Sequence, residues 1–156
     1  MFKAPRIYID TSVIGGCFDE EFQIWSNALI DDISKGLFDP VVSSVIEEEI
    51  EAAPEYVQNK FSDLIQLGAQ ILSLDKQALE LMKQYSKHKI IPAKFRNDMF
   101  HIAIAVANVD ILVSWNFKHI VRYDKIIKFN AVNIENNYHT IAIYSPREVT
   151  YYEKEI

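Results

Sequence analysis

The chain has 156 residues, 49% of them hydrophobic and 24% charged, which favours one globular domain over residues 1–156 rather than a disordered or fibrous chain. It has no run of about 18 apolar residues and no secretory signal pattern at its start, and the single Cys17 excludes an internal disulfide, so we expect a cytoplasmic protein without a membrane partner. The net charge of −6 disfavours a uniformly basic nucleic-acid-binding protein, because phosphate contacts need Lys and Arg.

Hydrophobic periodicity and turn residues predict strands that alternate with helices along the chain. The predicted strands cover residues 6–10, 40–43, 70–74, 110–114 and 140–144. The predicted helices cover residues 21–36, 44–53, 55–67, 76–87 and 98–107, with a short helical segment before the fifth strand and a last short helix from Ser145. This alternation implies a parallel sheet covered on both faces, so we expect a three-layer α/β/α domain.

Asp10 ends the first predicted strand, and parallel sheets of this kind place their active sites beyond the carboxyl ends of the strands. Thr11 and Ser12 add hydroxyl groups there, and we expect Gly15 and Gly16 to let the chain turn closely around the site. An Asp at a strand end also serves simply as a turn cap, so its role depends on what else gathers at that edge.

The helix after the second strand contains four acidic residues: Glu47, Glu48, Glu49 and Glu51. They cannot all face the same way, because successive helical residues are rotated by about 100°. Glu49 lies beside the apolar stripe of this helix, so we place it at the site. We interpret the other three as a solvated acidic face.

Asp98 and His101 are three residues apart on the apolar helix over 98–107 and therefore share one face. Asp98 also suits the first turn of a helix, where the helix dipole favours negative charge. We interpret His101 as a core or supporting group rather than a metal ligand. Asn116 follows the fourth strand and would meet Asp10 if strands one and four are neighbours, although Asn is also an ordinary turn residue.

These carboxylate and amide oxygens are ligands that suit Mg²⁺ or Mn²⁺ rather than zinc. A divalent ion held in this way activates water and neutralises charge on a phosphodiester. Residues 83–128 contain nine Lys or Arg and three acidic residues, a net charge of +6 that leaves −12 for the rest. This asymmetry predicts a basic flank beside an acidic centre. An equally simple interpretation is that the basic residues lie on helix faces exposed to solvent.

Taken together, four short motifs resemble the PIN-domain family, and the VapC-type toxins of toxin–antitoxin systems are its nearest-looking branch. They occur in the family's order and spacing over residues 6–120. The motifs are Ile7-Tyr-Ile-Asp10-Thr-Ser12 with Gly15-Gly16, Ser43-Ser-Val-Ile-Glu-Glu-Glu49, Asn97-Asp98-Met-Phe-His-Ile-Ala-Ile-Ala105 and Leu112-Val-Ser-Trp-Asn116-Phe.

The resemblance implies an α/β/α fold with a five-stranded parallel sheet and Mg²⁺- or Mn²⁺-dependent cleavage of RNA. It implies metal binding by three carboxylates: Asp10, Glu49 and Asp98. Thr11 or Ser12 would orient the metal-bound water. The family's fourth acidic position falls on Asn116, a departure that removes one negative charge. The implied partners are an RNA substrate, a cognate antitoxin and a second copy of the chain in a homodimer.

Two other classes of function remain open from the sequence. One is a PIN-like module that binds RNA or a protein without cleaving, which the uncharged Asn116 favours. The other is a phosphotransfer domain, but an aspartyl phosphatase would need a second Asp at the position of Ser12, and the receiver pattern is also incomplete. Phe22 and Trp25 would present apolar surface to an antitoxin or, more simply, pack against the sheet.

Overall fold

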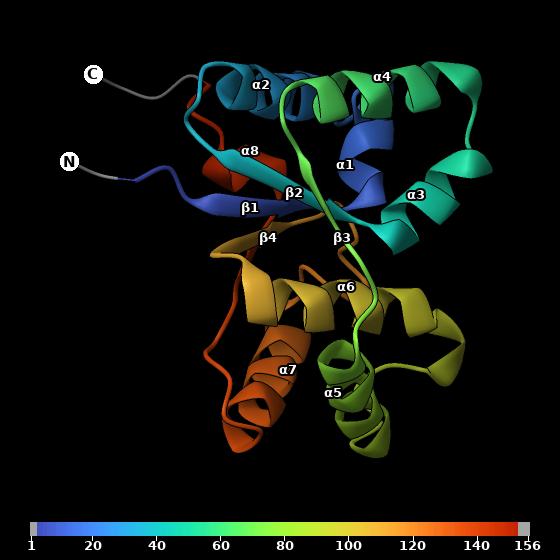
Figure 1. Cartoon of the computed structure of the whole chain (residues 1–156), viewed down its shortest axis with the longest axis vertical. Helices are drawn as coiled ribbons and strands as arrows, with labels where there is room; N and C mark the ends of the chain where they lie inside the picture. Colours follow the sequence, from blue (N-terminus) through green and yellow to red (C-terminus); the bar gives the residue numbers. More distant parts are fainter. Residues whose placement is uncertain (1–2, 153–156) are drawn as a thin grey trace.

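The structure is a computed structural model that describes residues 3–152. Its single sheet has five parallel strands in the order β3-β2-β1-β4-β5 (Figure 1). The strands are β1 (Arg6–Ile9), β2 (Asp39–Ser43), β3 (Gln70–Leu72), β4 (Ile111–Val113) and β5 (Ala142–Tyr144). The predicted fold class, a three-layer α/β/α arrangement with a five-stranded parallel sheet, is therefore confirmed.

Helices α1–α4 lie over one face of the sheet and α5–α7 over the other, while α8 packs beside α2 (Figure 1). The helices are α1 (Thr11–Gly16), α2 (Gln23–Ser34), α3 (Ser44–Glu51), α4 (Glu55–Gln66), α5 (Lys76–Lys87), α6 (Arg96–Asn108), α7 (Tyr123–Glu135) and α8 (Pro146–Val149), with a 3₁₀ turn η1 (Ala93–Phe95) before α6. Within residues 3–152, no helix combines the length and the apolar character that crossing a membrane requires.

The central strand β1 explains why the layers assemble in this way. Ile7, Tyr8 and Ile9 are completely buried, because both faces of a parallel sheet are covered by helices. β1 pairs with β2 on one side and with β4 on the other. The chain leaves β1 over one face and leaves β4 over the other, so the carboxyl ends of these two strands flank the point where the strand order reverses.

Two predicted segments were wrong in their local structure. Gly15 and Gly16 do not form a turn but belong to helix α1. At the start of this helix, the backbone amide of Val13 donates a hydrogen bond to the backbone carbonyl of Asp10. The segment before β5 is not short, since α7 runs from Tyr123 to Glu135. Its polar residues obscure the helical pattern, and the predicted strands 70–74, 110–114 and 140–144 are each shorter in the structure.

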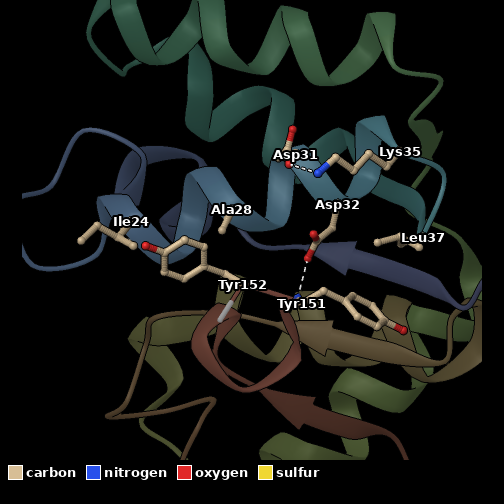
Figure 2. A pocket seen from close by; sticks show the side chains of 8 residues that line it. All are labelled: Ile24, Ala28, Asp31, Asp32, Lys35, Leu37, Tyr151 and Tyr152. Carbon is tan, nitrogen blue, oxygen red and sulfur yellow. Dashed lines mark hydrogen bonds and ion pairs between the residues drawn. The ribbon is translucent and has the colours of Figure 1, made fainter. Parts of the chain in front are cut away.

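The segment after α8 is bound to α2 by hydrogen bonds to a buried carboxylate, Asp32. Asp32 accepts hydrogen bonds from the Thr150 hydroxyl and from the Tyr151 amide, both at 2.8 Å. Figure 2 shows Asp32 pointing toward Tyr151, next to the exposed ion pair of Asp31 and Lys35. These contacts lie at a pocket of ≈ 530 Å³, and both hydrogen bonds hold Oδ2 of the buried Asp32 side chain.

Candidate metal centre

The candidate site lies at the carboxyl ends of β1 and β4, where the strand order reverses. Asp10 follows β1 directly, and Ser114 follows β4 directly. In open parallel sheets, the crevice at this point is where ligands bind. The site is therefore built on the central strand β1 and its neighbour β4, while α3 and α6 add side chains from the two helical layers.

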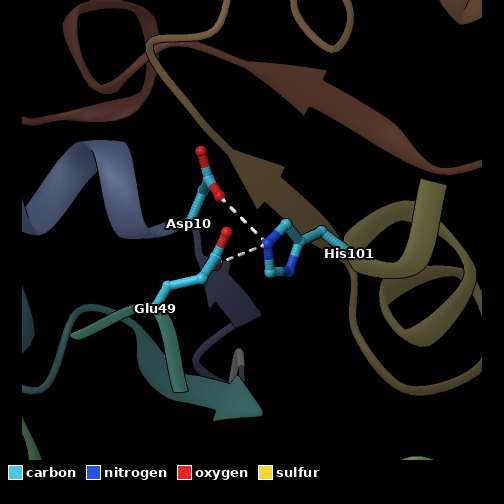
Figure 3. A group of neighbouring side chains, drawn as sticks. All are labelled: Asp10, Glu49 and His101. Carbon is cyan, nitrogen blue, oxygen red and sulfur yellow. Dashed lines mark hydrogen bonds and ion pairs between the residues drawn. The ribbon is translucent and has the colours of Figure 1, made fainter. Parts of the chain in front are cut away.

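The carboxylate of Asp10 is held in a fixed orientation by two serine hydroxyls. Its Oδ2 accepts hydrogen bonds from Ser12 Oγ at 2.6 Å and from Ser114 Oγ at 2.8 Å. The backbone amide of Trp115 in turn donates to Ser12 Oγ at 2.9 Å. Only 6% of Asp10 is exposed, and its Oδ1 faces His101 (Figure 3). Both hydroxyls therefore bind Oδ2 and leave Oδ1 directed toward His101.

Glu49 reaches the same place from α3. Its Oε1 accepts a hydrogen bond from the Thr11 hydroxyl at 2.7 Å and lies 2.9 Å from His101 Nε2. Asn97 Nδ2 lies 3.5 Å from the other oxygen, Oε2. Burial acts to raise the pKa of Glu49, but the hydrogen bond and charge of His101, together with Thr11 and Asn97, lower it below its ordinary value. Glu49 is thus stabilised as a carboxylate.

His101 lies between the two carboxylates (Figure 3). Its Nε2 is 2.9 Å from Glu49 Oε1 and 3.6 Å from Asp10 Oδ1, and its Nδ1 is 2.7 Å from the Tyr8 hydroxyl, which also bonds Ser43. Burial opposes the charged ring, yet Glu49, Asp10 and Asp98 raise the pKa of His101. Ligand atoms of Asp10, Glu49 and His101 lie within 4.8 Å of one another, so this group could hold a metal ion.

The sequence had placed His101 in a supporting role, and the structure brings it into this group. The spacing to Asp98 already put His101 on the face that points toward the site. What the sequence could not show is that both ring nitrogens have partners, Tyr8 on one side and Glu49 on the other. These partners fix the orientation of the ring, as hydrogen bonds to ligand side chains commonly do in metal sites.

Asp98, the third predicted metal ligand, lies at the start of α6 and is half-buried. Its Oδ2 is 3.1 Å from His119 Nδ1. Burial, with the negative charge of Asp10 added, raises the pKa of Asp98 although His119 and His101 act to lower it. The structure therefore brings Asp98 into electrostatic contact with the cluster but outside the group within 4.8 Å. His119 was missed, because it lies in a loop 21 residues beyond Asp98.

Asn116 has a partner set of its own. Its Oδ1 accepts hydrogen bonds from the backbone amides of Lys118 at 3.2 Å and His119 at 3.0 Å, and the backbone amide of Asn116 donates to Ser114 Oγ at 2.9 Å. This is the pattern of an Asx turn. The turn explanation accounts for the oxygen of Asn116, and ligation of a metal by this residue stays a prediction.

Basic side chains border the side of the site where Asp98 lies. Phe95 packs on the His119 ring with a centroid distance of 4.1 Å. The ammonium groups of Lys94 and Lys118 lie 5.2 Å and 5.8 Å from the centre of the Phe95 ring. Two of the nine basic residues of the segment 83–128 therefore lie on an aromatic ring beside this acidic residue.

Comparison with known proteins supports the fold. No model of a protein family matches the chain, and no curated protein matches it. Among solved structures, a chain in the crystal structure of VapBC2 from Rickettsia felis bound to a DNA fragment from their promoter is similar, with a TM-score of 0.58 and 13% sequence identity. The match covers 90% of this chain and 98% of that chain. The two chains therefore share the PIN-like fold over nearly their whole lengths.

Proposed function

We propose that the protein is a PIN-domain ribonuclease that hydrolyses RNA phosphodiester bonds with Mg²⁺ or Mn²⁺. The observation that carries the proposal is the buried Asp10 at the strand-order reversal, with one oxygen held by two serines and the other facing Glu49 and His101. The shared fold with a chain of VapBC2 supports it. Confinement of negative charge at one edge is what a divalent cation site requires.

The residues present fit such an ion. Asp10, Glu49 and Asp98 offer hard carboxylate oxygens, the donor type that Mg²⁺ and Mn²⁺ prefer. When bound, the ion supplies an activated water and positive charge against the phosphodiester. Ser12 and Ser114 hold Asp10 in place, and Thr11 and His101 do the same for Glu49. Orientation of the attacking water by Thr11 or Ser12 belongs to the same proposal.

Replacing the central carboxylate tests this function. Asp10→Asn should abolish cleavage of single-stranded RNA in Mn²⁺ and weaken Mn²⁺ binding in calorimetry, while an amide oxygen still accepts from both serines. Asp39→Asn is the matched control, because Asp39 lies at the amino end of β2 in a partly exposed ion pair with Arg6. Full cleavage by Asp10→Asn would contradict the assignment.

A second candidate is a module that binds RNA or a protein without cleaving it. The engagement of Asn116 Oδ1 in a turn favours it, since the uncharged oxygen then adds nothing to the metal site. Asn116→Asp distinguishes the roles: tighter Mn²⁺ binding would place the residue at the metal, and unchanged affinity would leave it a turn residue. RNA binding without cleavage, together with no heat up to millimolar Mn²⁺, would favour the second candidate.

We further propose that the chain is the toxin of a VapC-type pair in the cytoplasm, with a cognate antitoxin as partner and a homodimer as its assembly. The fold shared with a chain of VapBC2 supports this proposal. Expression of the protein should arrest growth, and expression of Asp10→Asn should not. Cleavage of RNA without growth arrest would remove the toxin role and leave the ribonuclease, and light scattering would measure the oligomeric state.

A further inference from the structure

A pocket of ≈ 310 Å³ with aromatic walls lies next to the candidate metal centre, between α2, the segment after β4, and α8. We call it the aromatic pocket. It is lined by Phe22, Trp25, Trp115, Phe117 and Arg147, together with Ser145 and the acidic side chains of Glu21 and Glu148. Neither the proposed metal binding nor the hydrolysis uses any of these side chains. Its volume is close to the lower limit of about 300 Å³ for small-molecule sites.

Two of the aromatic side chains form a rigid wall. Trp115 stacks on Phe22 with a centroid distance of 4.1 Å and an interplanar angle of 16°, and its indole nitrogen donates to Ser26 Oγ at 2.8 Å. Phe117 lies 6.0 Å from Trp115 between centroids and is 50% exposed. An exposed ring beside a fixed stacked pair is a surface on which another flat ring can stack without rearrangement.

The pocket is joined directly to the acidic centre. The Trp115 amide donates to Ser12 Oγ at 2.9 Å, and Ser12 Oγ donates to Asp10 Oδ2 at 2.6 Å. The backbone of Trp115 is therefore two hydrogen bonds away from the Asp10 carboxylate, while the side chain of Trp115 lines the aromatic pocket. The guanidinium of Arg147 is 4.9 Å from the centre of the Trp25 ring, so the pocket also has a cation that can bond to a phosphate or to the edge of a base.

We propose that the aromatic pocket binds an unpaired nucleobase of the RNA, next to the phosphodiester at the acidic centre. The proposal rests on the proposed function for the identity of the ligand. Aromatic stacking faces with an adjoining Arg are the combination by which proteins hold single-stranded nucleic acids. Because every base has a flat face, such a subsite holds single-stranded RNA in place with little dependence on its sequence.

The test measures binding of a fluorescein-labelled, single-stranded RNA of twelve nucleotides in the Asp10→Asn background, where cleavage cannot consume it. Adding Phe117→Ala should weaken binding roughly 5- to 100-fold, the range for loss of one stacked base. Adding Phe117→Tyr should preserve affinity. Ile134→Ala is the matched control, since Ile134 is an exposed apolar residue near the end of α7 that leads to the amino end of β5, whereas the site lies at the carboxyl ends of the strands.

A scan of the RNA with single abasic nucleotides identifies the base. At one position, loss of the base should weaken binding to the Asp10→Asn protein. For that RNA, adding Phe117→Ala should cause no further loss of affinity, because both changes remove the same stack. The proposal would be overturned if Asp10→Asn proteins with and without Phe117→Ala bound intact RNA with equal affinity. It would also be overturned if the Asp10→Asn protein did not bind the RNA. In the first case, the aromatic wall would be a surface for a protein partner or an ordinary part of the exterior.

The outcome is separable from that of the proposed function. If the otherwise unaltered chain cleaves RNA in Mn²⁺ and Phe117→Ala leaves its KM unchanged, the nucleobase subsite is wrong and the ribonuclease stands. If the chain never cleaves RNA but Phe117→Ala weakens binding as described, hydrolysis is wrong and the subsite stands.

Discussion

Gly16→Ala would put a methyl carbon where the structure has no space for it. An added Cβ would lie 2.7 Å from both Ser26 Oγ and Trp115 Nε1, and 2.9 Å from Trp115 Cδ1. These are the two groups that hydrogen-bond each other, so at least one of them or the backbone of α1 must shift, and we expect the bond to lengthen or break. Gly15 belongs to the same helix, and a Cβ there would meet nothing within 4 Å. Gly15→Ala is therefore the matched control.

The magnitude follows from three terms. Overpacking a filled site costs about 1–3 kcal/mol, and the lost hydrogen bond costs about 1 kcal/mol. Replacing a helical Gly by Ala returns at most about 1 kcal/mol. We expect a net loss of about 1–3 kcal/mol for Gly16→Ala, which lowers the melting temperature by roughly 2–12 °C in a chain of this size. Gly15→Ala should be neutral or slightly stabilising.

Differential scanning calorimetry of the two variants measures the difference in melting temperature, and tryptophan fluorescence reports the displaced indole. Because the Trp115 amide donates to Ser12 and Ser12 donates to Asp10, Mn²⁺ affinity should fall in Gly16→Ala and not in Gly15→Ala. Equal melting temperatures for the two variants would refute the reasoning, since they share a helix and differ only in what the methyl group meets.

Three further outcomes are expected from chemical unfolding. Ser114→Ala removes one of the two hydroxyls on Asp10 and should cost about 1.5–3 kcal/mol, the range for a hydrogen bond to a charged group; a loss below 0.5 kcal/mol would speak against it. Tyr8→Phe leaves His101 Nδ1 buried without its partner and should cost about 1–3 kcal/mol, and unchanged stability would show that another group replaces the hydroxyl. Burial raises the pKa of Cys17 to about 11, so its thiol stays protonated in the folded chain while the unfolded chain ionises; stability is fully present below the ordinary pKa of 9.0 and falls as the pH rises toward 11. Cys17→Ala should lose less stability between pH 8 and 11, and an equal loss would contradict the assignment.

The sheet and most helices follow from local sequence patterns, but helix α1 and the full length of helix α7 do not. β1 and β4 are short apolar runs bounded by polar residues, and the helix predicted over 76–87 has the bounds of α5. The short helix α1 has two glycines at its end, which favour a turn when only local preferences are considered. Packing of Val13 and Ile14 against the sheet decides the helix instead.

The acidic residues of the candidate site and the nearby Thr11, Ser12 and His101 were predictable, but the support that Ser114 gives to Asp10 was not. Asp10 and Glu49 follow from strand ends and helix faces, and the structure brings them together with His101. The partner that fixes Asp10 from the other strand, Ser114, is 104 residues away along the chain. No local pattern relates side chains at that separation, and only the pairing of β1 with β4 brings them together.

The same separation gives the carboxylate a place in the order of folding. Ser114 reaches Asp10 only when the fourth strand has docked beside the first, and closing so long a loop is the slow kind of step in sheet formation. Until then Asp10 lacks one of its two hydroxyl partners, and the Trp115 amide cannot restrain the other. A chain emerging from the ribosome would thus carry an unfinished acidic centre until the sequence through residue 115 is free to fold.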